Sequence, residues 1–204
     1  MKILHISNYF LPWLGYDAEL ARAQKKEGHK LLFAASNRIP KSKSGTGSRP
    51  VSPIDVVDSA LHRAMTIGNR VILLPGVLIT LIRFRPSVVH CHLLFDLTPV
   101  IVALAKPFLR YRLIYCCHST YENTDTDSSL VRKALYVVFR QTAGRIIKTA
   151  SDHIIAVAEN EQDMASQELS VPLKQIKIVR LGVNVESYHT DISSKSIERK
   201  RLGI

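Results

Sequence analysis

Short apolar runs alternate with helical patterns along this chain, and that alternation constrains its fold more than any other feature. The runs that predict strands are residues 2–7, 31–35, 88–92, 113–117, 153–157 and 176–179. Strands that are apolar on both faces are typical of a parallel sheet that helices cover on each side. The sequence therefore predicts an α/β fold with a doubly wound parallel sheet, in which ligands bind at the carboxyl ends of the strands.

Helical spacing of apolar residues separates these runs. It predicts helices over residues 16–28, near Leu61, over 71–84, over about 94–109 and over 130–149. Residues 38–53 are rich in Lys, Ser, Gly and Pro and have no apolar period, which is typical of an exposed loop rather than a linker between domains. The 204 residues fit one domain of the larger ordinary size, or a domain with a tail.

The cysteines and the longest apolar segments bear on where the chain resides. Cys91, Cys116 and Cys117 lie inside apolar runs, and an odd count with one adjacent pair favours a reducing compartment over a disulfide framework. Residues 1–7 are too short an apolar stretch for a signal peptide, and residues 71–82 and 97–109 fall short of a membrane span. We expect a cytoplasmic protein.

The positive charge gathers in one part of the chain. The formal net charge is +11 at pH 7, and residues 59–121 hold seven Lys or Arg but a single acidic residue, Asp96. Such a field favours an anionic partner, either acidic lipid, nucleotide, sugar phosphate or nucleic acid. Nucleic acid is the least favoured, because no interleaved aromatic residues and no known reading motif accompany the charge. We predict no nucleic-acid partner.

Residues 8–15 join the first predicted strand to the first predicted helix. Unpaired N–H groups and the helix dipole can hold an anion there, and Gly15 would let a ligand approach the backbone closely. A tight turn without a ligand explains the same residues. Asp17 and Glu19 suit a first helical turn, yet their charge would oppose a phosphate placed there.

His118 follows the predicted strand 113–117 and precedes the polar run 119–123, so we expect it at the carboxyl end of that strand. An imidazole there could donate to a sugar hydroxyl or a phosphate, or orient a nucleophile. A histidine on the rim of the site with no catalytic role is the alternative.

His90 and His92 are spaced to point to the same side of one strand, with Cys91 between them on the opposite side. Zinc is one interpretation of this pair. No second Cys or His cluster supplies further ligands at a familiar spacing, so packing is favoured and we predict no metal. His92 is nearer the strand end and is the better candidate for a ligand contact.

A basic amphipathic helix is predicted over residues 130–150, which contain no acidic residue. Its basic residues are Arg132, Lys133, Arg140, Arg145 and Lys148. An ordinary surface helix with its apolar stripe on the sheet is the favoured interpretation. Docking of these five residues on anionic lipid is the alternative, which would make the protein peripheral at the cytoplasmic face of a membrane.

Four segments together resemble the N-terminal domain of the family 4 glycosyltransferases, which have the GT-B fold of two Rossmann-like domains facing a cleft. The segments are residues 1–7 with Pro12 and Gly15 after them, residues 20–30, residues 85–92 and residues 176–184. Their order and spacing cover nearly the whole chain. The family often has a second glycine where this chain has Tyr16 and an asparagine where it has Arg180, which implies a more closed or differently tuned phosphate loop.

The resemblance implies roles for several residues. Gly15 would lie in the loop that contacts donor phosphate or acceptor, and His118 would be the catalytic histidine that faces the transferred sugar. The other residues expected to bind substrate or phosphate are Tyr16, Tyr9, His92 and Ser119. Transfer in this family is usually retaining and needs no metal; the nucleotide sugar is a substrate rather than a cofactor, and the acceptor is a glycan or a lipid-linked molecule.

The resemblance also implies a domain organisation. Residues 1–190 would form a Rossmann-like acceptor-side domain, and residues 191–204 would be a connector toward a C-terminal nucleotide-sugar-binding domain that this chain lacks. Without that domain we expect no transferase activity. Two alternatives remain: half of a sugar-nucleotide epimerase with the same architecture, and a non-catalytic module that binds anionic lipid or another polyanion.

Overall fold

The chain folds around a seven-stranded sheet in a computed structural model that describes residues 1–9, 16–37, 58–67, 70–92, 97–117, 137–138 and 140–180. In spatial order the strands are β3 (Ser59–His62), β2 (Lys30–Ser36), β1 (Lys2–Tyr9), β6 (Val88–His92), β7 (Arg112–Cys117), β8 (His153–Ala156) and β9 (Ile176–Ile178). Every neighbouring pair in this sheet is parallel. The strands β4 (Met65–Ile67) and β5 (Arg70–Leu73) form a separate antiparallel hairpin.

The strand order reverses between β1 and β6. From β1 the chain winds outward through β2 to β3, then crosses to β6 and winds outward through β7 and β8 to β9. This is the doubly wound order of a Rossmann-like fold, with the β4–β5 hairpin inserted in the crossover, and it confirms the predicted fold class. Ligands of such sheets bind outside the carboxyl ends of the strands at the reversal.

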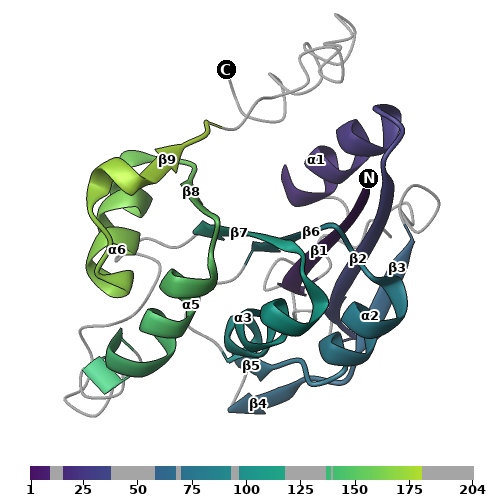
Figure 1. Cartoon of the computed structure of the whole chain (residues 1–204), viewed down its shortest axis with the longest axis horizontal. Coiled ribbons are helices and arrows are strands. Elements are labelled where there is room, and N and C mark those ends of the chain that lie inside the picture. The colour runs from purple at the N-terminus through teal and green to yellow at the C-terminus, as the bar shows by residue number, and fades with distance from the viewer. Residues whose placement is uncertain are drawn as a thin grey trace, which may run out of the picture.

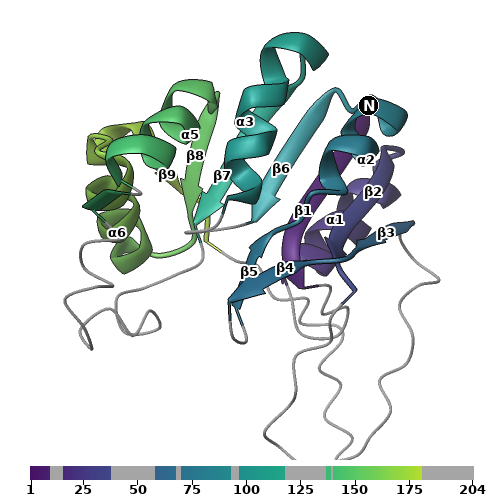
Figure 2. The same cartoon turned by 90° about the horizontal axis from the view of Figure 1, so that it is seen from below.

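Helices cover both faces of the sheet. On one face lies α1 (Tyr16–Lys26), and along the other follow α2 (Val77–Phe84), α3 (Thr98–Leu109), α5 (Arg145–Ala150) and α6 (Glu159–Leu169). Figure 1 shows α1 on one side of the strands and α2, α3 and α5 on the other. Figure 2, turned by 90°, shows α2, α3 and α5 in a row across the sheet. A π-helical turn, Arg140–Gly144, precedes α5, and a 3-10 turn, Leu173–Gln175, precedes β9.

Alternate residues of the central strands enter two separate cores. Leu4 and Ile6 of β1 and Val89 of β6 join the larger core, under α2, α3, α5 and α6. Ile3 of β1 and Phe33 of β2 join a smaller core under α1. The period of two along each strand thus assigns every second side chain to the α1 side.

Four helix ends adopt the left-handed conformation, among them the end of α6 at Ser170, with a φ of 51°. Gly28, just after α1, has a φ of 82°, which glycine adopts without a steric penalty. Arg85 after α2 and Arg110 after α3 adopt φ values of 48° and 57°. Pro86 follows Arg85 and excludes a further helical turn there.

The structure confirms the predicted strands, corrects two helical predictions and adds one helix. Leu61 lies in strand β3, which pairs with β2, rather than in a helix. Residues 70–73 form β5, and α2 begins only after Pro75 and Gly76, because the proline ends the strand and a short apolar run alone does not distinguish strand from helix. Helix α6 was not predicted. The predicted loop at 38–53 and residues 130–136 lie outside the described residues.

The three cysteines are free thiols and all are buried. Among the described residues, no helix combines the length and the apolar character needed to cross a membrane.

Candidate functional site

Three buried histidines lie together at the reversal point of the sheet. The parallel register places His5 of β1 opposite His90 of β6, and Ser7 opposite His92. Contacts of His5 and His92 with residues of α1 put all three rings on the α1 side, whereas Cys91 enters the larger core. This confirms the predicted shared orientation of His90 and His92. We call His5, His90 and His92 the histidine cluster.

A row of close contacts joins the histidine cluster to α1. It runs from Gln24 through His5 and His92 to Asp17, and we call these four residues the row. His5 Nε2 donates to Gln24 Oε1 at 2.8 Å, so His5 Nδ1 is left as an acceptor. His92 Nε2 therefore donates to His5 Nδ1 at 2.9 Å. The remaining nitrogen of His92, Nδ1, lies 3.4 Å from Oδ1 of Asp17, in the first turn of α1.

Burial keeps the groups of this row uncharged. It lowers the pKa of His5 to about 4, against a small rise from the hydrogen bond with Gln24, and it lowers the pKa of His90 to about 3. The pKa of His92 is lowered well below its ordinary value, first by burial and then by the two neighbouring imidazoles. Burial raises the pKa of Asp17 to about 7. Below that pH the row holds neutral imidazoles and a protonated carboxyl group.

The histidine cluster could in principle hold a metal ion, because one nitrogen from each ring lies within 4.8 Å of the others. The rings of His5 and His92 are nearly parallel, at 12°, and their N–H···N contact uses an electron pair that a metal would need. The His90 and His92 rings are 4.0 Å apart between centroids and tilted by 31°, so their lone pairs run side by side. This arrangement favours hydrogen bonding over the converging lone pairs of a tetrahedral site.

One atom of the histidine cluster stands apart from the row. His90 Nε2 is buried and has no hydrogen-bond partner among the described residues. A bare ring nitrogen in that position leaves an unused lone pair, which costs less than an N–H group without an acceptor. We therefore expect the proton of His90 on Nδ1.

The structure describes only part of the expected substrate site. Outside the described residues lie Gly15, His118 and Ser119. Tyr9 ends β1 and Tyr16 begins α1, with only their backbones described, so both flank the reversal point. His92 ends β6 but is buried, and its ring faces His5 and Asp17.

Three residues of the row were not assigned to the site from the sequence: His5, Gln24 and Asp17, the last of which was considered only as a charge at a helix start. The sequence does contain a signal for His5. If the strands of His5 and His90 are neighbours, the two histidines lie side by side on the same face of the sheet. Using that signal requires knowing that β1 and β6 are adjacent, which follows from the strand order of a doubly wound sheet.

A second polar group lies at the carboxyl end of β8. Glu161, in the first turn of α6, is buried, and its Oε2 accepts the N–H of Val157 at 2.9 Å. Burial raises the pKa of Glu161, and the hydrogen bonds from the backbone oppose this rise. The contact is that of a helix cap, which accounts for the carboxylate without a ligand.

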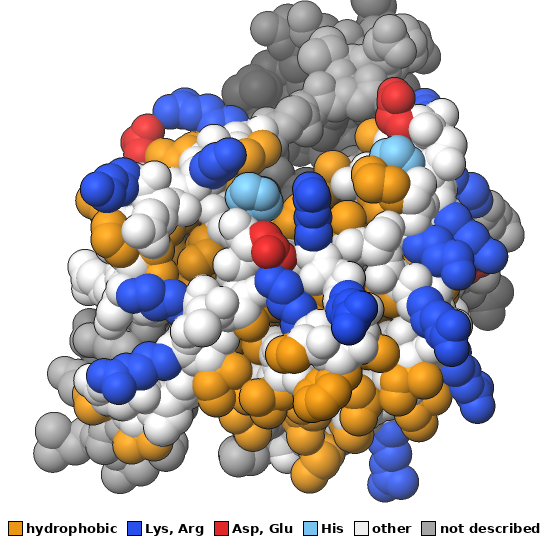
Figure 3. Space-filling model, viewed as in Figure 1, with side chains coloured by type: hydrophobic (Ala, Val, Ile, Leu, Met, Phe, Trp, Pro, Cys, Tyr) orange, Lys and Arg blue, Asp and Glu red, His pale blue; other side chains and the backbone are white. Residues whose placement is uncertain are grey.

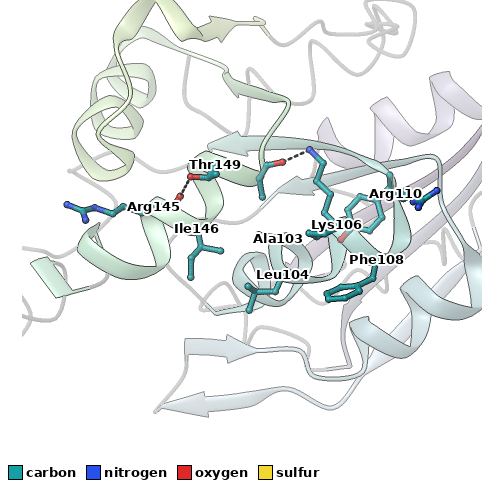
Figure 4. Close-up of a pocket in the computed structure, with 11 residues that line it drawn as sticks. Ala103, Leu104, Lys106, Phe108, Arg110, Arg145, Ile146 and Thr149 are labelled. Carbon is teal, nitrogen blue, oxygen red and sulfur yellow. Dashed lines mark hydrogen bonds between the residues drawn. The ribbon is translucent and has the colours of Figure 1, made fainter.

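A cavity lies away from the reversal point. A groove of about 860 Å³ runs between α3 and α5, on the face of the sheet opposite to α1. Figure 4 shows Leu104, Phe108 and Ile146 along it, with Arg110 and Arg145 at its two ends. Lys106 is already engaged, because its Nζ donates to the carbonyl of Ala150 and to Asp152.

Exposed apolar side chains continue from this groove onto α2. The exposed large hydrophobic residues of the two helices are Leu78, Ile79, Ile82, Leu104 and Phe108, the last of which is 83% exposed. We call these five residues the apolar patch. Figure 3 shows hydrophobic side chains gathered on the part of the surface that α2 and α3 form, with Lys and Arg around them.

The basic residues predicted to contact a membrane are only partly described. Outside the described residues lie Arg132 and Lys133, and the side chain of Arg140 is also not described. Arg145 is exposed and lines the groove. Lys148 turns the other way, and its Nζ donates to the carbonyl of Ser170 at 2.5 Å.

Solved structures of several proteins share the fold of this chain. HepE of Anabaena in complex with UDP and glucose superposes with a TM-score of 0.67 at 16% identity, over 100% of this chain and 50% of that one. Sucrose-phosphate synthase of Thermosynechococcus elongatus gives 0.59 at 14%, over 100% and 52%. The glycotransferase of kitacinnamycin gives 0.55 at 12%, over 93% and 54%. The chain thus spans about half the length of these structures.

The sequence comparisons are consistent with this fold. No curated protein matches the chain significantly. The family model of Glycosyltransferase Family 4 matches residues 16–187, which is more than half of the chain and includes the histidine cluster residues of β6 and all of α1. The seven-stranded parallel sheet and this match together show that the chain belongs to glycosyltransferase family 4 and has the fold of a GT-B half.

Proposed function

We propose that residues 1–190 form the acceptor-side domain of a sugar transferase with a nucleotide-sugar donor, and that residues 191–204 lead to a donor-binding domain. The family match over residues 16–187 carries this proposal. Two observations support it: the chain spans about half the length of the superposed structures, and a structure of HepE contains UDP-glucose. The transfer would be retaining and would need no metal.

The reacting groups would meet outside the carboxyl ends of β1, β6 and β7. Tyr9 and Tyr16 flank the segment that holds Gly15, and Cys117 ends β7 directly before His118 and Ser119. In this proposal His118 faces the transferred sugar, and the backbone near Gly15 faces phosphate or acceptor. Rate enhancement would come from positioning and from stabilising the departing diphosphate.

The test is an assay of nucleotide release and glycoside formation by the full-length gene product, with glycan and lipid-linked acceptors. His118→Ala should lower turnover more than about tenfold, on the scale of a positioned polar group. His153→Ala is the control and should leave turnover unchanged, because His153 lies at the amino end of β8, away from the carboxyl ends of the strands. Turnover by residues 1–204 alone, or normal turnover of His118→Ala, would contradict the proposal. Conversion of the nucleotide sugar without acceptor would favour the epimerase alternative.

We also propose that the apolar patch rests on a membrane that contains anionic lipid. Helix α2 is apolar on its buried and on its exposed side, which is unusual for a helix at a water-facing surface. Arg83, Arg85 and Arg110 stand beside the patch, and residues 59–92 contain no acid. An apolar surface with a cationic rim matches the acyl and headgroup layers of an acidic bilayer. The groove between α3 and α5 would then admit part of a lipid.

Sedimentation with vesicles of neutral lipid, with and without 30% anionic lipid, tests this surface. Ile82→Glu and Phe108→Glu should each lower the partition coefficient by about tenfold or more, given the free energy of burying one large apolar side chain. Leu173→Glu is the matched control, because Leu173 is an exposed leucine outside the patch. Equal loss in all three variants, or no binding by the unmodified chain, would contradict a role for the apolar patch.

A further inference from the structure

The contact between His92 and Asp17 needs a proton that neither neutral His92 nor ionised Asp17 supplies. The hydrogen bonds through His5 place the only proton of neutral His92 on Nε2, so Nδ1 presents a lone pair to Oδ1 of Asp17 at 3.4 Å. A lone pair and a carboxylate oxygen repel each other at this distance. Asp17 Oδ1 is buried and has no hydrogen-bond partner among the described residues, so a proton placed between the two atoms would give this oxygen a partner and remove the repulsion.

We propose that Asp17 and His92 hold one proton between them, and that the resulting row from Asp17 through His92 and His5 to Gln24 fixes α1 against β1 and β6. Asp17 and Gln24 lie two helical turns apart on α1, so the row grips this helix at two points. His5 and His92 come from the two strands that flank the reversal of the sheet. The four residues are positioning residues, because none has been placed against a substrate.

Among the described contacts of Asp17 and His92, no charged group competes for the proton. His5 and His90 face it from β1 and β6 and are neutral, because burial lowers the pKa of both rings. On β7, burial first and Asp17 second raise the pKa of the Cys116 thiol, which is therefore uncharged and within electrostatic reach of Asp17. Glu161 of α6 acts on the same thiol, and burial raises the pKa of that carboxyl group also. The shared proton is thus held by desolvation.

One consequence rests on the proposed function. Asp17 lies in the first turn of α1, where an ionised carboxylate would repel a donor phosphate. While the pair keeps its proton, Asp17 adds no negative charge there. Ionisation of Asp17 would both weaken the grip on α1 and place a charge beside the phosphate.

NMR titration of the full chain tests the shared proton without any donor or acceptor. The carboxyl carbon of Asp17 should titrate near pH 7, and the ring nitrogens of His92 should shift in the same range, because the two groups titrate as one unit. His5 and His92 should both show the Nε2–H tautomer. Asp17→Asn should abolish the shift of the His92 signals. Asp152→Asn should leave it unchanged, because Asp152 directly precedes the amino end of β8. An Asp17 midpoint near 4, or the Nδ1–H tautomer on His92, would overturn the proposal.

Amide exchange reports on the positioning role. Between pH 5 and 7 the opening constant of α1, corrected for intrinsic exchange, should rise about tenfold per pH unit and then level off, because opening releases the shared proton. In Asp17→Asn, whose amide can still donate to His92, it should be flat. A pH-independent opening constant in the unmodified chain would refute the role in positioning.

Zinc addition separates this inference from a metal site and from the proposed function. One equivalent of Zn²⁺ alone should leave the His5, His90 and His92 signals in place. If one equivalent of Zn²⁺ shifted the NMR signals of all three rings, and His90→Asn abolished these shifts, the cluster would be a metal site and the proposal of a shared proton would be wrong. A chain that passes the NMR tests but whose full-length protein transfers no sugar would refute the proposed function and leave this inference standing.

Discussion

The two sides of β1 and β6 bury very different chemistry although they belong to the same strands. Toward α2 and α3 these strands present Leu4, Ile6 and Val89 to a large apolar core. Toward α1 they present the histidine cluster, whose members are also almost fully buried. Both sides are buried, but on these strands only the α1 side carries polar side chains, which must stay neutral and which gain from hydrogen-bond partners.

The stability that the fold gains on one side of these strands does not depend on protonation, whereas the stability that it gains on the other side does. The apolar core is insensitive to pH and tolerant of small shifts, since dispersion and the hydrophobic effect are non-directional. The α1 side is directional, because it depends on tautomers and on one proton. Four predictions test this difference.

The largest effect should come from pH acting on the α1 side. Burial raises the pKa of Asp17 from 3.8 to about 7, so the folded chain keeps a proton that the unfolded chain loses between these values. The resulting stability is full below pH 4 and is lost as the pH rises through 7. The free energy of unfolding of the unmodified chain, relative to Asp17→Asn, should fall by about 4 kcal/mol over this range.

Denaturant melts at half-unit pH intervals would measure that difference. Asp152→Asn offers a control of opposite sign, because hydrogen bonds and the charge of Lys106 lower the pKa of Asp152 despite its partial burial. Its contribution is lost as the pH falls, not as it rises. Curves of the same sign for both variants would remove the contrast between the two groups.

The next effect belongs to the apolar side. Leu81 of α2 is fully buried, and Leu81→Ala should lower the free energy of unfolding by about 3 kcal/mol at any pH from 5 to 8. Ile82, its neighbour on the exposed side, is the matched site, and Ile82→Ala should cost below about 1 kcal/mol. Urea melts of both variants are the measurement; a pH-dependent loss in Leu81→Ala would blur the comparison.

A smaller effect is expected at the end of the row. Gln24→Leu removes the acceptor of the His5 Nε2–H group and leaves a buried donor without a partner, which costs about 2 kcal/mol. Lys26→Leu, on the exposed surface of the same helix, should change stability by less than about 0.5 kcal/mol. Thermal melts would show this contrast, and equal midpoints for the two variants would argue against the His5–Gln24 bond.

The smallest effect on stability should occur at the apolar patch. Phe108 is exposed, so Phe108→Ser should change the free energy of unfolding by less than about 0.5 kcal/mol. A loss as large as that of Leu81→Ala would mean that the patch belongs to the core. The same urea melts measure it.

The sequence predicted the sheet well because parallel strands carry their signal locally. The apolar runs at 31–35, 113–117 and 153–157 each correspond to a strand, β2, β7 and β8. The errors fall where a local pattern is ambiguous. Residues 59–62 and 70–73 are short apolar runs whose strand character comes from a partner strand, and α6 carries too weak an apolar stripe to stand out.

The candidate site was predicted only in part, for a different reason. The shared side of His90 and His92 followed from their spacing alone. Their link with His5, Asp17 and Gln24 depends on a contact across 87 residues of sequence and on the seating of α1, which no local pattern encodes. The neutral state of these groups depends on burial, which appears only in the folded chain.

Arg85 and Arg110 end α2 and α3 in a conformation that costs an ordinary residue about 1 kcal/mol and costs glycine almost nothing. Glycine at either position would therefore give a more heat-resistant chain with one cation fewer beside the apolar patch. Selection for melting temperature alone would favour glycine at both positions and would weaken the contact that we propose with acidic lipid. These two helix ends set thermal tolerance and surface charge against each other, so each property can be tuned there only at the expense of the other.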